Sequence, residues 1–466
     1  MSNLGKKQKG QIFTPDYIVD IMLDYIDYKS DILQKHIIDN SCGDGAFLIK
    51  IVDRYCREYI KYHTNNTILK HELETYIHGI EMDILAYNKC LEKLNNLVSE
   101  YGLTNVKWDV INGDTLLIKK YHNMMDFVVG NPPYVRVHNL DINYDNVKQF
   151  NFASSGMIDL YLVFYEIGFN MLNHDGKLSY ITPSSWMNSL AGRNFRNYIQ
   201  ESKKLVGVID LAHNQIFNNA TTYVIITYFD KTYNGDTFDY YGFGENNKIF
   251  IDRLSISDCI IDDIFYLGSK IDLDIIRNIK NNNTKSVKVK NGYATLADSI
   301  FINELPFYEL TIPIIKASTG KWYRCFYPYD DIGKPLDKDF IFSFDKIKDY
   351  LNFNKNTLLK GKTEKENKNW YLYGRTQALN DTNIDKISIN TLIKDLNSIK
   401  LNIVPKNSGV YSGLYIITNQ DFNVISNIIK SENFIKYIKI LKKYKSGGYY
   451  TFNSKDIEDY LNFNLK

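Results

Sequence analysis

Cysteine and proline are scarce in this sequence, and long apolar runs are absent. Among its 466 residues are five cysteines and nine prolines, and no two cysteines form a CxxC pair. This spacing predicts neither a metal site nor a disulfide framework, so a reducing cytoplasm is the simplest location. No apolar run approaches the roughly 18 residues of a membrane span, and the polar, basic first ten residues are not a secretory signal. We therefore expect no membrane partner.

Charge is nearly balanced overall but unevenly distributed along the chain. Of the 56 Lys and Arg residues, 24 lie in residues 1–250, whereas 29 of the 54 Asp and Glu residues lie there. Residues 251–466 are therefore basic, which favours a polyanionic partner. The alternative is a solvated surface in a chain that is rich in lysine, asparagine and tyrosine. The length allows two or three domains.

A proline-containing stretch follows a short apolar run near the middle of the first half. Residues 125–129 read as a buried strand, which Gly130 ends. The sequence Asn-Pro-Pro-Tyr follows at once, at 131–134. It offers a side-chain amide, a backbone carbonyl held by rigid prolines, and an aromatic face. This set suits a flat ring that carries an amino group, bound at the end of a strand. The alternative is an ordinary proline turn.

A second glycine-containing turn lies nearer the N-terminus. Residues 36–39 read as a strand, 40–45 as a turn and 46–59 as a helix. Glycines there let the backbone approach a ligand closely. The dinucleotide fingerprint G-x-G-x-x-G is absent, because the turn has only two glycines. This pattern argues against NAD and for S-adenosylmethionine, whose ammonium group would suit Asp39.

Acidic residues end two further predicted strands. Glu81 follows the strand at 76–80, and Asp114 follows the strand at 106–111. An acid at the end of the second strand can accept hydrogen bonds from both ribose hydroxyls. Met82 could pack on an adenine face, and Asp114 could accept from its amino group. The alternative for each acid is a solvated loop.

The segment before the first predicted helix contains Gln-Ile-Phe-Thr-Pro, at 11–15. Thr14 is expected to cap the helix that follows, with Pro15 at its first position. Capping alone would explain both residues. The functional alternative places this helix N-terminus against an anionic group of a ligand.

Strands and helices alternate through the first half, which predicts an α/β, doubly wound, Rossmann-like sheet. Ligands bind at the carboxyl ends of such strands, where Asp39, Glu81, Asp114 and Asn131 all fall. Residues 62–75 read as a polar insertion and 231–248 as a linker, so we expect domains at 1–245 and 246–466, the second a mixed α+β domain. The other expected elements are helices at 159–172, 194–201, 270–279, 384–399 and 420–443, a strand at 177–181, and a hairpin of strands at 206–211 and 223–229.

Residues 10–230 resemble the N6-adenine DNA methyltransferases of type II restriction–modification systems, and within these the gamma class. The resemblance rests on the order of Thr-Pro, the glycine-containing turn and Asn-Pro-Pro-Tyr. Residues 287–292, 370–377 and 446–450 also resemble stretches of such enzymes. One departure is Asn40, where the family often has proline. The resemblance implies an S-adenosylmethionine-dependent catalytic domain followed by a target-recognition domain that binds double-stranded DNA. It also implies a cytoplasmic, nucleoid-associated protein of bacterial or phage origin, with a cognate restriction endonuclease as a possible partner.

The resemblance also assigns roles to individual residues. The predicted cofactor contacts are Ile12, Thr14, Asp39, Ser41, Gly43, Glu81, Met82, Asp114 and Asn131. The predicted catalytic residues are Asn131, Pro132 and Tyr134, which with Phe217 would hold the target adenine. Candidate DNA contacts in the basic half are Lys288, Lys290, Lys316, Lys321 and Arg375.

Three other functions fit parts of the sequence. Asn-Pro-Pro-Tyr also resembles motifs of protein-glutamine and ribosomal-RNA guanine methyltransferases, but the Thr-Pro segment and the large basic half argue against both. A DNA-binding subunit with a vestigial cofactor fold would be expected to lose the strand-end acids, which are all present. A fused nuclease would need paired acids and a lysine, and the sequence shows no convincing pattern of this kind.

Overall fold

A computed structural model of the chain describes residues 14–137, 144–154, 156–214, 216, 223–282, 285–360 and 368–465. The chain folds into two compact units, Met1–Leu273 and Asp274–Lys466. The division lies further along than the expected one after residue 245. The physical reason is a hairpin at the place where the sequence suggested a linker.

That hairpin consists of β8 (Thr237–Gly244) and β9 (Asn247–Ser255). β8 pairs in parallel with β6 (Leu205–Asp210) and so extends the sheet of unit 1. The side chains of Phe238, Tyr240 and Leu254 are buried. The expectation of a linker at 231–248 is therefore wrong, because alternate residues of this polar stretch contribute to the core.

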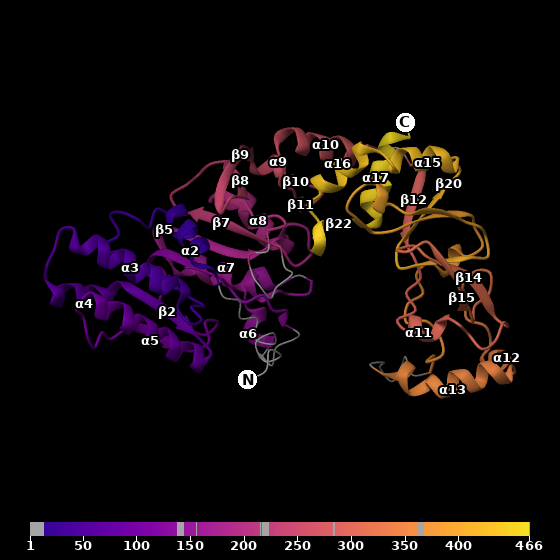
Figure 1. The fold of residues 1–466 in the computed structure, drawn as a ribbon, viewed down its shortest axis with the longest axis horizontal. Helices are drawn as coiled ribbons and strands as arrows, with labels where there is room; N and C mark the ends of the chain where they lie inside the picture. Colours follow the sequence, from indigo (N-terminus) through magenta and orange to yellow (C-terminus); the bar gives the residue numbers. More distant parts are fainter. Residues whose placement is uncertain are drawn as a thin grey trace. The chain divides into compact units, whose positions relative to one another are not determined.

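Unit 1 is built on a mixed sheet, which in the described residues has nine strands in the order β3-β2-β1-β4-β5-β7-β6-β8-β9 (Figure 1). β1 to β5 pair in parallel, and β7 pairs antiparallel with both β5 and β6. The α/β fold and the predicted hairpin are confirmed. The remaining strands of the sheet are β1 (Ile37–Asp39), β2 (Ile77–Glu81), β3 (Asp109–Asn112), β4 (Met125–Gly130), β5 (Leu172–Pro183) and β7 (Val224–Asp230).

Helices cover both faces of this sheet. On one face, α2, α3, α4 and α5 share a core with Ile226 and Tyr228 of β7. On the other face, Tyr165 of α7 packs against Phe229 of β7 and bonds through its hydroxyl to Thr227. These β7 residues alternate along the strand, as a strand buried on both sides requires. The helices are α2 (Asp16–Tyr25), α3 (Ala46–Ile60), α4 (Asn66–Tyr76), α5 (Ile84–Glu100), α6 (Tyr144–Lys148), α7 (Leu160–Met171), α8 (Arg193–Ser202) and α9 (Ile256–Cys259).

Three local expectations in unit 1 differ from the structure. The polar insertion expected at 62–75 is mostly the helix α4, which buries Leu69 and Leu73 and which Asn65 caps. Thr14 does not cap α2, because the N-cap residue is Pro15 and no side chain bonds to the first turn. The strand expected at 106–111 forms only from Asp109 onward.

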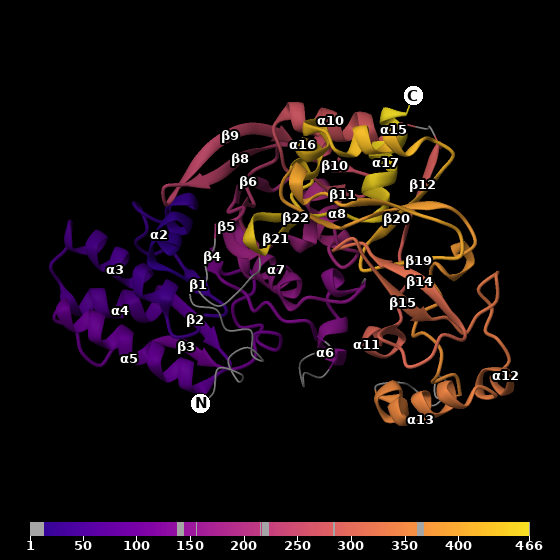
Figure 2. The ribbon, with the colours of Figure 1, turned by 45° about the vertical axis from the view of Figure 1, so that its right-hand side comes forward.

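Unit 2 is a mixed α+β domain, as predicted (Figure 2). Its described residues form two four-stranded sheets, β12-β20-β16-β18 and β13-β15-β14-β19, and one three-stranded sheet, β17-β22-β21. Its strands are β12 (Val287–Asn291), β13 (Ile302–Asn303), β14 (Thr311–Lys316), β15 (Lys321–Phe326), β16 (Lys386–Ile389), β17 (Leu392–Ile393), β18 (Leu401–Val404), β19 (Gly409–Tyr411), β20 (Leu414–Thr418), β21 (Tyr444–Lys445) and β22 (Tyr449–Thr451).

The helices of this half agree only in part with the sequence. The helix at 270–279 is confirmed as α10 (Lys270–Lys280). The helix expected at 384–399 is wrong, because β16 and β17 occupy it and β16 is buried at every position. Residues 420–443 form two helices rather than one, since Ser431 caps the second. The other helices are α11 (Asp298–Phe301), α12 (Lys338–Phe342), α13 (Asp345–Leu359), α15 (Phe422–Ile429), α16 (Glu432–Ile440) and α17 (Ser454–Asn464).

Candidate active site

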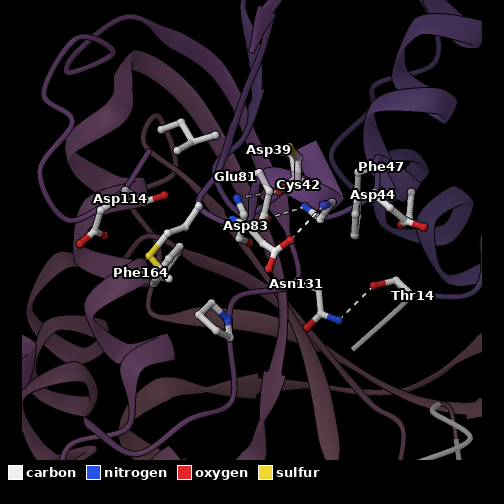
Figure 3. A pocket seen from close by; sticks show the side chains of 18 of the residues that line it. Thr14, Asp39, Cys42, Asp44, Phe47, Glu81, Asp83, Asp114, Asn131 and Phe164 are labelled. Carbon is white, nitrogen blue, oxygen red and sulfur yellow. Dashed lines mark hydrogen bonds between the residues drawn. The ribbon is translucent and has the colours of Figure 1, made fainter. Parts of the chain in front are cut away.

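A cavity of about 240 Å³ opens at the carboxyl ends of the parallel strands of unit 1 (Figure 3). Asp39 ends β1, Glu81 ends β2 and Asn131 directly follows β4. β1 pairs in parallel with both neighbours, so these three strand ends meet at one edge of the sheet. Eight predicted residues line the cavity: Thr14, Asp39, Ser41, Gly43, Glu81, Met82, Asp114 and Asn131.

The carboxylate of Glu81 ties the glycine-containing turn to β2. One oxygen accepts the backbone N–H of Gly43 at 2.9 Å, and the other accepts that of Asp83 at 2.7 Å. Glu81 is buried. Both bonds hold the Glu81 side chain at the end of β2, beside the cavity. The ribose role of Glu81 stays a prediction.

Asp39 is the most deeply buried acid of the cavity. It is 1 % exposed, and its Oδ1 accepts the backbone N–H of Ser41 at 3.1 Å. Burial, with a smaller contribution from the charge of Glu81, raises the pKa of Asp39 to about 8. A bound cation would favour the carboxylate form. This is the environment expected of a residue that receives an ammonium group.

Gly130 makes room for that carboxylate. A Cβ atom at Gly130 would lie 2.7 Å from Oδ1 of Asp39, closer than the two atoms can approach without a shift. Because β1 and β4 are paired, every larger side chain at this position would press on Asp39. Gly130 therefore both ends β4 and leaves space for the side chain of Asp39 on β1.

The side chain of Asn131 bonds to a residue from a distant segment of the chain. Its Nδ2 donates to the hydroxyl oxygen of Thr14 at 3.0 Å, and Thr14 is buried. In Figure 3 the amide oxygen of Asn131 points away from Thr14. The Thr-Pro segment thus orients the amide at the end of β4, which is a different role from the predicted helix cap.

Two of the other predicted adenine contacts, Pro132 and Tyr134, are not among the described residues that line the cavity. Pro132 is buried, and Pro133 is the proline of this stretch that reaches the cavity wall. The hydroxyl of Tyr134 donates to the backbone oxygen of Ile181 in β5 at 3.0 Å. Burial raises the pKa of Tyr134 well above its ordinary value, so its hydroxyl stays neutral. Ile12 and Phe217 lie outside the described residues.

Sequence reasoning missed the apolar wall of the cavity. Leu160 and Phe164 of α7 and Phe47 of α3 line it. Figure 3 shows Phe164 on the same side of the pocket as Asp114, opposite Thr14. One signal was present: α7 is apolar around nearly its whole circumference, which indicates burial on all sides. Nothing in the sequence showed which of its aromatic residues faces a cavity.

The five candidate DNA contacts of unit 2 are dispersed over its elements. Lys316 and Lys321 stand directly opposite each other on β14 and β15. Lys288 of β12 and Arg375 are exposed. Lys290 instead forms an ion pair with Asp381. Two of the five candidates, Lys316 and Lys321, are therefore adjacent in the structure. A third, Lys290, is paired with an acid of the same unit.

The described residues contain neither a candidate metal site nor a candidate membrane-spanning helix. No group of three or more His, Cys, Asp or Glu side chains among them could hold a metal ion. Within the same residues, no helix is both long and apolar enough to cross a bilayer.

Part of the chain is similar to known proteins. Residues 33–217 match the family model described as Eco57I restriction-modification methylase. The type II methyltransferase M.BstVI of Geobacillus stearothermophilus is 29 % identical over 245 residues, which are 49 % of this chain and 43 % of that protein. The type II restriction enzyme and methyltransferase RM.Eco57I of Escherichia coli is 24 % identical over 80 % of this chain and 48 % of its own length. The chain thus spans about half the length of these relatives.

Solved structures share the fold at low identity. The type IIL restriction-modification enzyme MmeI, solved in complex with DNA, has a TM-score of 0.69 over 97 % of this chain and 68 % of its own, at 12 % identity. The DrdV–DNA complex has a TM-score of 0.56 over 86 % of this chain and 48 % of its own, also at 12 % identity. These values show a common fold and nothing further.

The fold and the cavity together resemble a methyltransferase domain of the S-adenosylmethionine-dependent kind. The matched segment, residues 33–217, is more particularly similar to a restriction–modification methylase. S-adenosylmethionine is therefore the expected cofactor. The donor set fits it, because two buried acids and an apolar wall surround one cavity.

Proposed function

We propose that the chain methylates the N6 amino group of adenine in duplex DNA, as the modification enzyme of a restriction–modification system. One observation carries this proposal: the amide of Asn131 lies at the wall of the cofactor cavity and is oriented by Thr14. The family match supports the reaction type. A cognate restriction endonuclease would be its partner in the cell.

The chemistry follows from the amine that must react. The lone pair of the adenine amino group is delocalised into the ring, so the nitrogen is a poor nucleophile. The amide oxygen of Asn131 and the carbonyl oxygen of Pro132 can each accept one N–H of this group. The two bonds favour a pyramidal nitrogen and stabilise the positive charge that develops on it during attack. S-adenosylmethionine supplies the methyl group on a positively charged sulfur, and no strong base is needed beforehand.

The adenine must leave the double helix to reach Asn131. Tyr134 would then stack on the base. Its hydroxyl is fixed to the backbone of Ile181, so the ring would present one set orientation and lose little entropy on binding. The proximity of cofactor and amine would supply much of the remaining rate acceleration.

Recognition of DNA would fall to unit 2. Lys316 and Lys321 stand directly opposite each other on paired strands. Two like charges in this position repel each other, and a bound anion would relieve that repulsion. Phosphate contacts of this kind position a protein on the duplex. Lys288 and Arg375 stay candidates, whereas the ion pair with Asp381 makes Lys290 a weaker one.

The test is methyl transfer from labelled S-adenosylmethionine to duplex DNA, to RNA and to protein in parallel. Transfer to the DNA alone is expected, with the label on adenine N6. The Asn131→Ala variant should lose transfer while its cofactor affinity stays within a few-fold of the natural chain. Near-normal turnover in that variant, or label on RNA or protein instead, would disprove the assignment. Methylation-sensitive sequencing of DNA from expressing cells would then identify the target sequence.

A further inference from the structure

Three lysines that the proposed function leaves unused surround a hollow in unit 2. The hollow measures about 490 Å³ and is lined by Lys338, Lys355, Leu359, Lys368 and Trp370. Lys338 belongs to α12 and Lys355 to α13, which lie side by side in Figures 1 and 2. Lys368 precedes the buried Trp370. The three ammonium groups thus come from three segments of the chain.

Two of the three ammonium groups lie over aromatic rings that pack against each other. Nζ of Lys338 lies 5.6 Å from the ring centroid of Phe342, and Nζ of Lys355 lies 5.4 Å from that of Trp370. The two rings pack edge to face, with centroids 6.1 Å apart. A ring face attracts a cation without neutralising it. The lysines are therefore oriented, and their charge stays available to a ligand.

No acid in the described part of unit 2, residues 274–282, 285–360 and 368–465, pairs with any of the three lysines within 4.0 Å. Asp337, the neighbour of Lys338 in the chain, accepts the backbone N–H groups of Asp339 and Phe340 instead. Other lysines of this unit are paired, as Lys280 is with Asp459. Three like charges around one hollow repel each other, and a bound anion would relieve that repulsion.

We propose that this hollow binds the phosphodiester backbone of duplex DNA and does not read its sequence. The proposal rests on the proposed function, which makes DNA the polyanion that unit 2 meets. Lysine binds phosphate as a point charge, and phosphate contacts carry no sequence information themselves. Trp370 is buried, so it offers no face on which a base could stack. The hollow is a non-specific anchor that adds to the contacts at Lys316 and Lys321.

The test compares two triple variants of the full chain. The first combines Lys338→Ala, Lys355→Ala and Lys368→Ala. The matched control combines Lys430→Ala, Lys436→Ala and Lys439→Ala, which removes three exposed lysines of the same unit, the first directly after α15 and the other two in α16. Binding to a duplex of arbitrary sequence is followed by fluorescence anisotropy over a range of KCl concentrations. Circular dichroism confirms that both variants are folded.

Each phosphate contact contributes about 0.9 to the slope of log affinity against log salt concentration. The first variant should therefore bind less tightly at low salt, with a slope shallower by about 0.9 to 2.7, and the control should keep the natural slope. An unchanged slope in the first variant overturns the proposal. So does an equal change in both variants, because it would reflect net charge alone.

A second titration separates DNA from free anions. Inorganic phosphate is added while the tryptophan fluorescence is recorded. Saturable binding that disappears in the first variant, with an unchanged DNA slope, would make the hollow a small-anion site and overturn the DNA assignment. Methyl transfer distinguishes this failure from that of the proposed function. At saturating DNA the first variant should methylate the same sites as the natural chain, whereas a wrong function would show as no transfer to DNA by the natural chain.

Discussion

The side-chain amide of Asn131 donates to the hydroxyl of Thr14 across 117 positions of sequence. This bond links the segment before α2 to the end of β4, where the proposed chemistry takes place. It fixes the rotation of the amide, and so it decides where the amide oxygen points. Thr14 is therefore a positioning residue in the proposed reaction.

Replacing Thr14 by valine should slow methyl transfer without preventing cofactor binding. Valine keeps the shape and removes the hydroxyl, so Asn131 loses the bond that orients its amide. A lost hydrogen bond of this kind costs about 1–3 kcal/mol, which corresponds to roughly a 5- to 150-fold decrease in kcat. Thr14→Ser keeps the hydroxyl and should stay within a few-fold of the natural rate. Equal losses in both variants would show that packing, rather than the hydrogen bond, matters here.

The sequence revealed the strand-end residues because β1, β2 and β4 are short, apolar and sharply ended. Parallel pairing then places Asp39, Glu81 and Asn131 at one edge, whatever the rest of the chain does. The role of Thr14 could not be foreseen in this way. A threonine before a helix has a local explanation as a cap, and only the tertiary fold shows that its hydroxyl bonds to Asn131 instead.

The sequence concealed a helix with a narrow buried stripe, α4, and a short strand that is buried throughout, β16. The helix α4 is exposed except for a narrow stripe around Leu69 and Leu73, so its composition resembles a loop. The strand β16 has only 4 residues, all of them buried, and periodicity alone cannot distinguish so short a buried strand from part of a buried helix. In both cases the tertiary contacts decide the structure, and a window of local sequence does not contain them.

The cofactor affinity should depend on pH through Asp39. Its pKa of about 8 means that this acid is mostly neutral at pH 6 in the free protein. An ammonium group binds better to the carboxylate, so the affinity should rise by up to about tenfold per pH unit from about pH 6 to 7.5, where an α-amino group is still largely charged. Calorimetry at pH 7 in buffers of different ionisation enthalpy should detect release of nearly one proton.

Asp39→Asn is the control for that pH dependence. Asparagine has the same size and does not titrate in this range, so the variant should bind more weakly and release no proton. A natural chain whose affinity is flat over this range, or a variant that retains the slope, would show that another group is responsible.

Phe164 should contribute to cofactor binding as part of the cavity wall. Phe164→Leu shortens a buried side chain that faces the cavity, and we expect the cofactor to bind about three- to tenfold more weakly, from the apolar area lost. Phe169→Leu changes the same residue type on the same helix, where the ring packs on Tyr198 and Phe229 instead. Both variants should unfold more easily, but cofactor affinity, measured by calorimetry, should fall only in the first. A similar loss of affinity in both would remove Phe164 from the site.

Lys280 should matter for the stability of unit 2 far more than an exposed lysine bound to the same acid. Its side chain is 4 % exposed and lies 2.7 Å from Asp459 and 3.9 Å from Asp456. Removing one partner of a buried pair costs up to about 3–5 kcal/mol, but Lys455 and Lys443 would still pair with Asp459 and Asp456, so Lys280→Met should lower the thermal midpoint by a few degrees. Lys455 also contacts Asp459, at 2.6 Å, but its side chain is 63 % exposed. An exposed pair contributes about 0–1 kcal/mol, so Lys455→Met should hardly shift the midpoint. Similar shifts in calorimetric scans of the two variants would contradict the buried pair as the source of this stability.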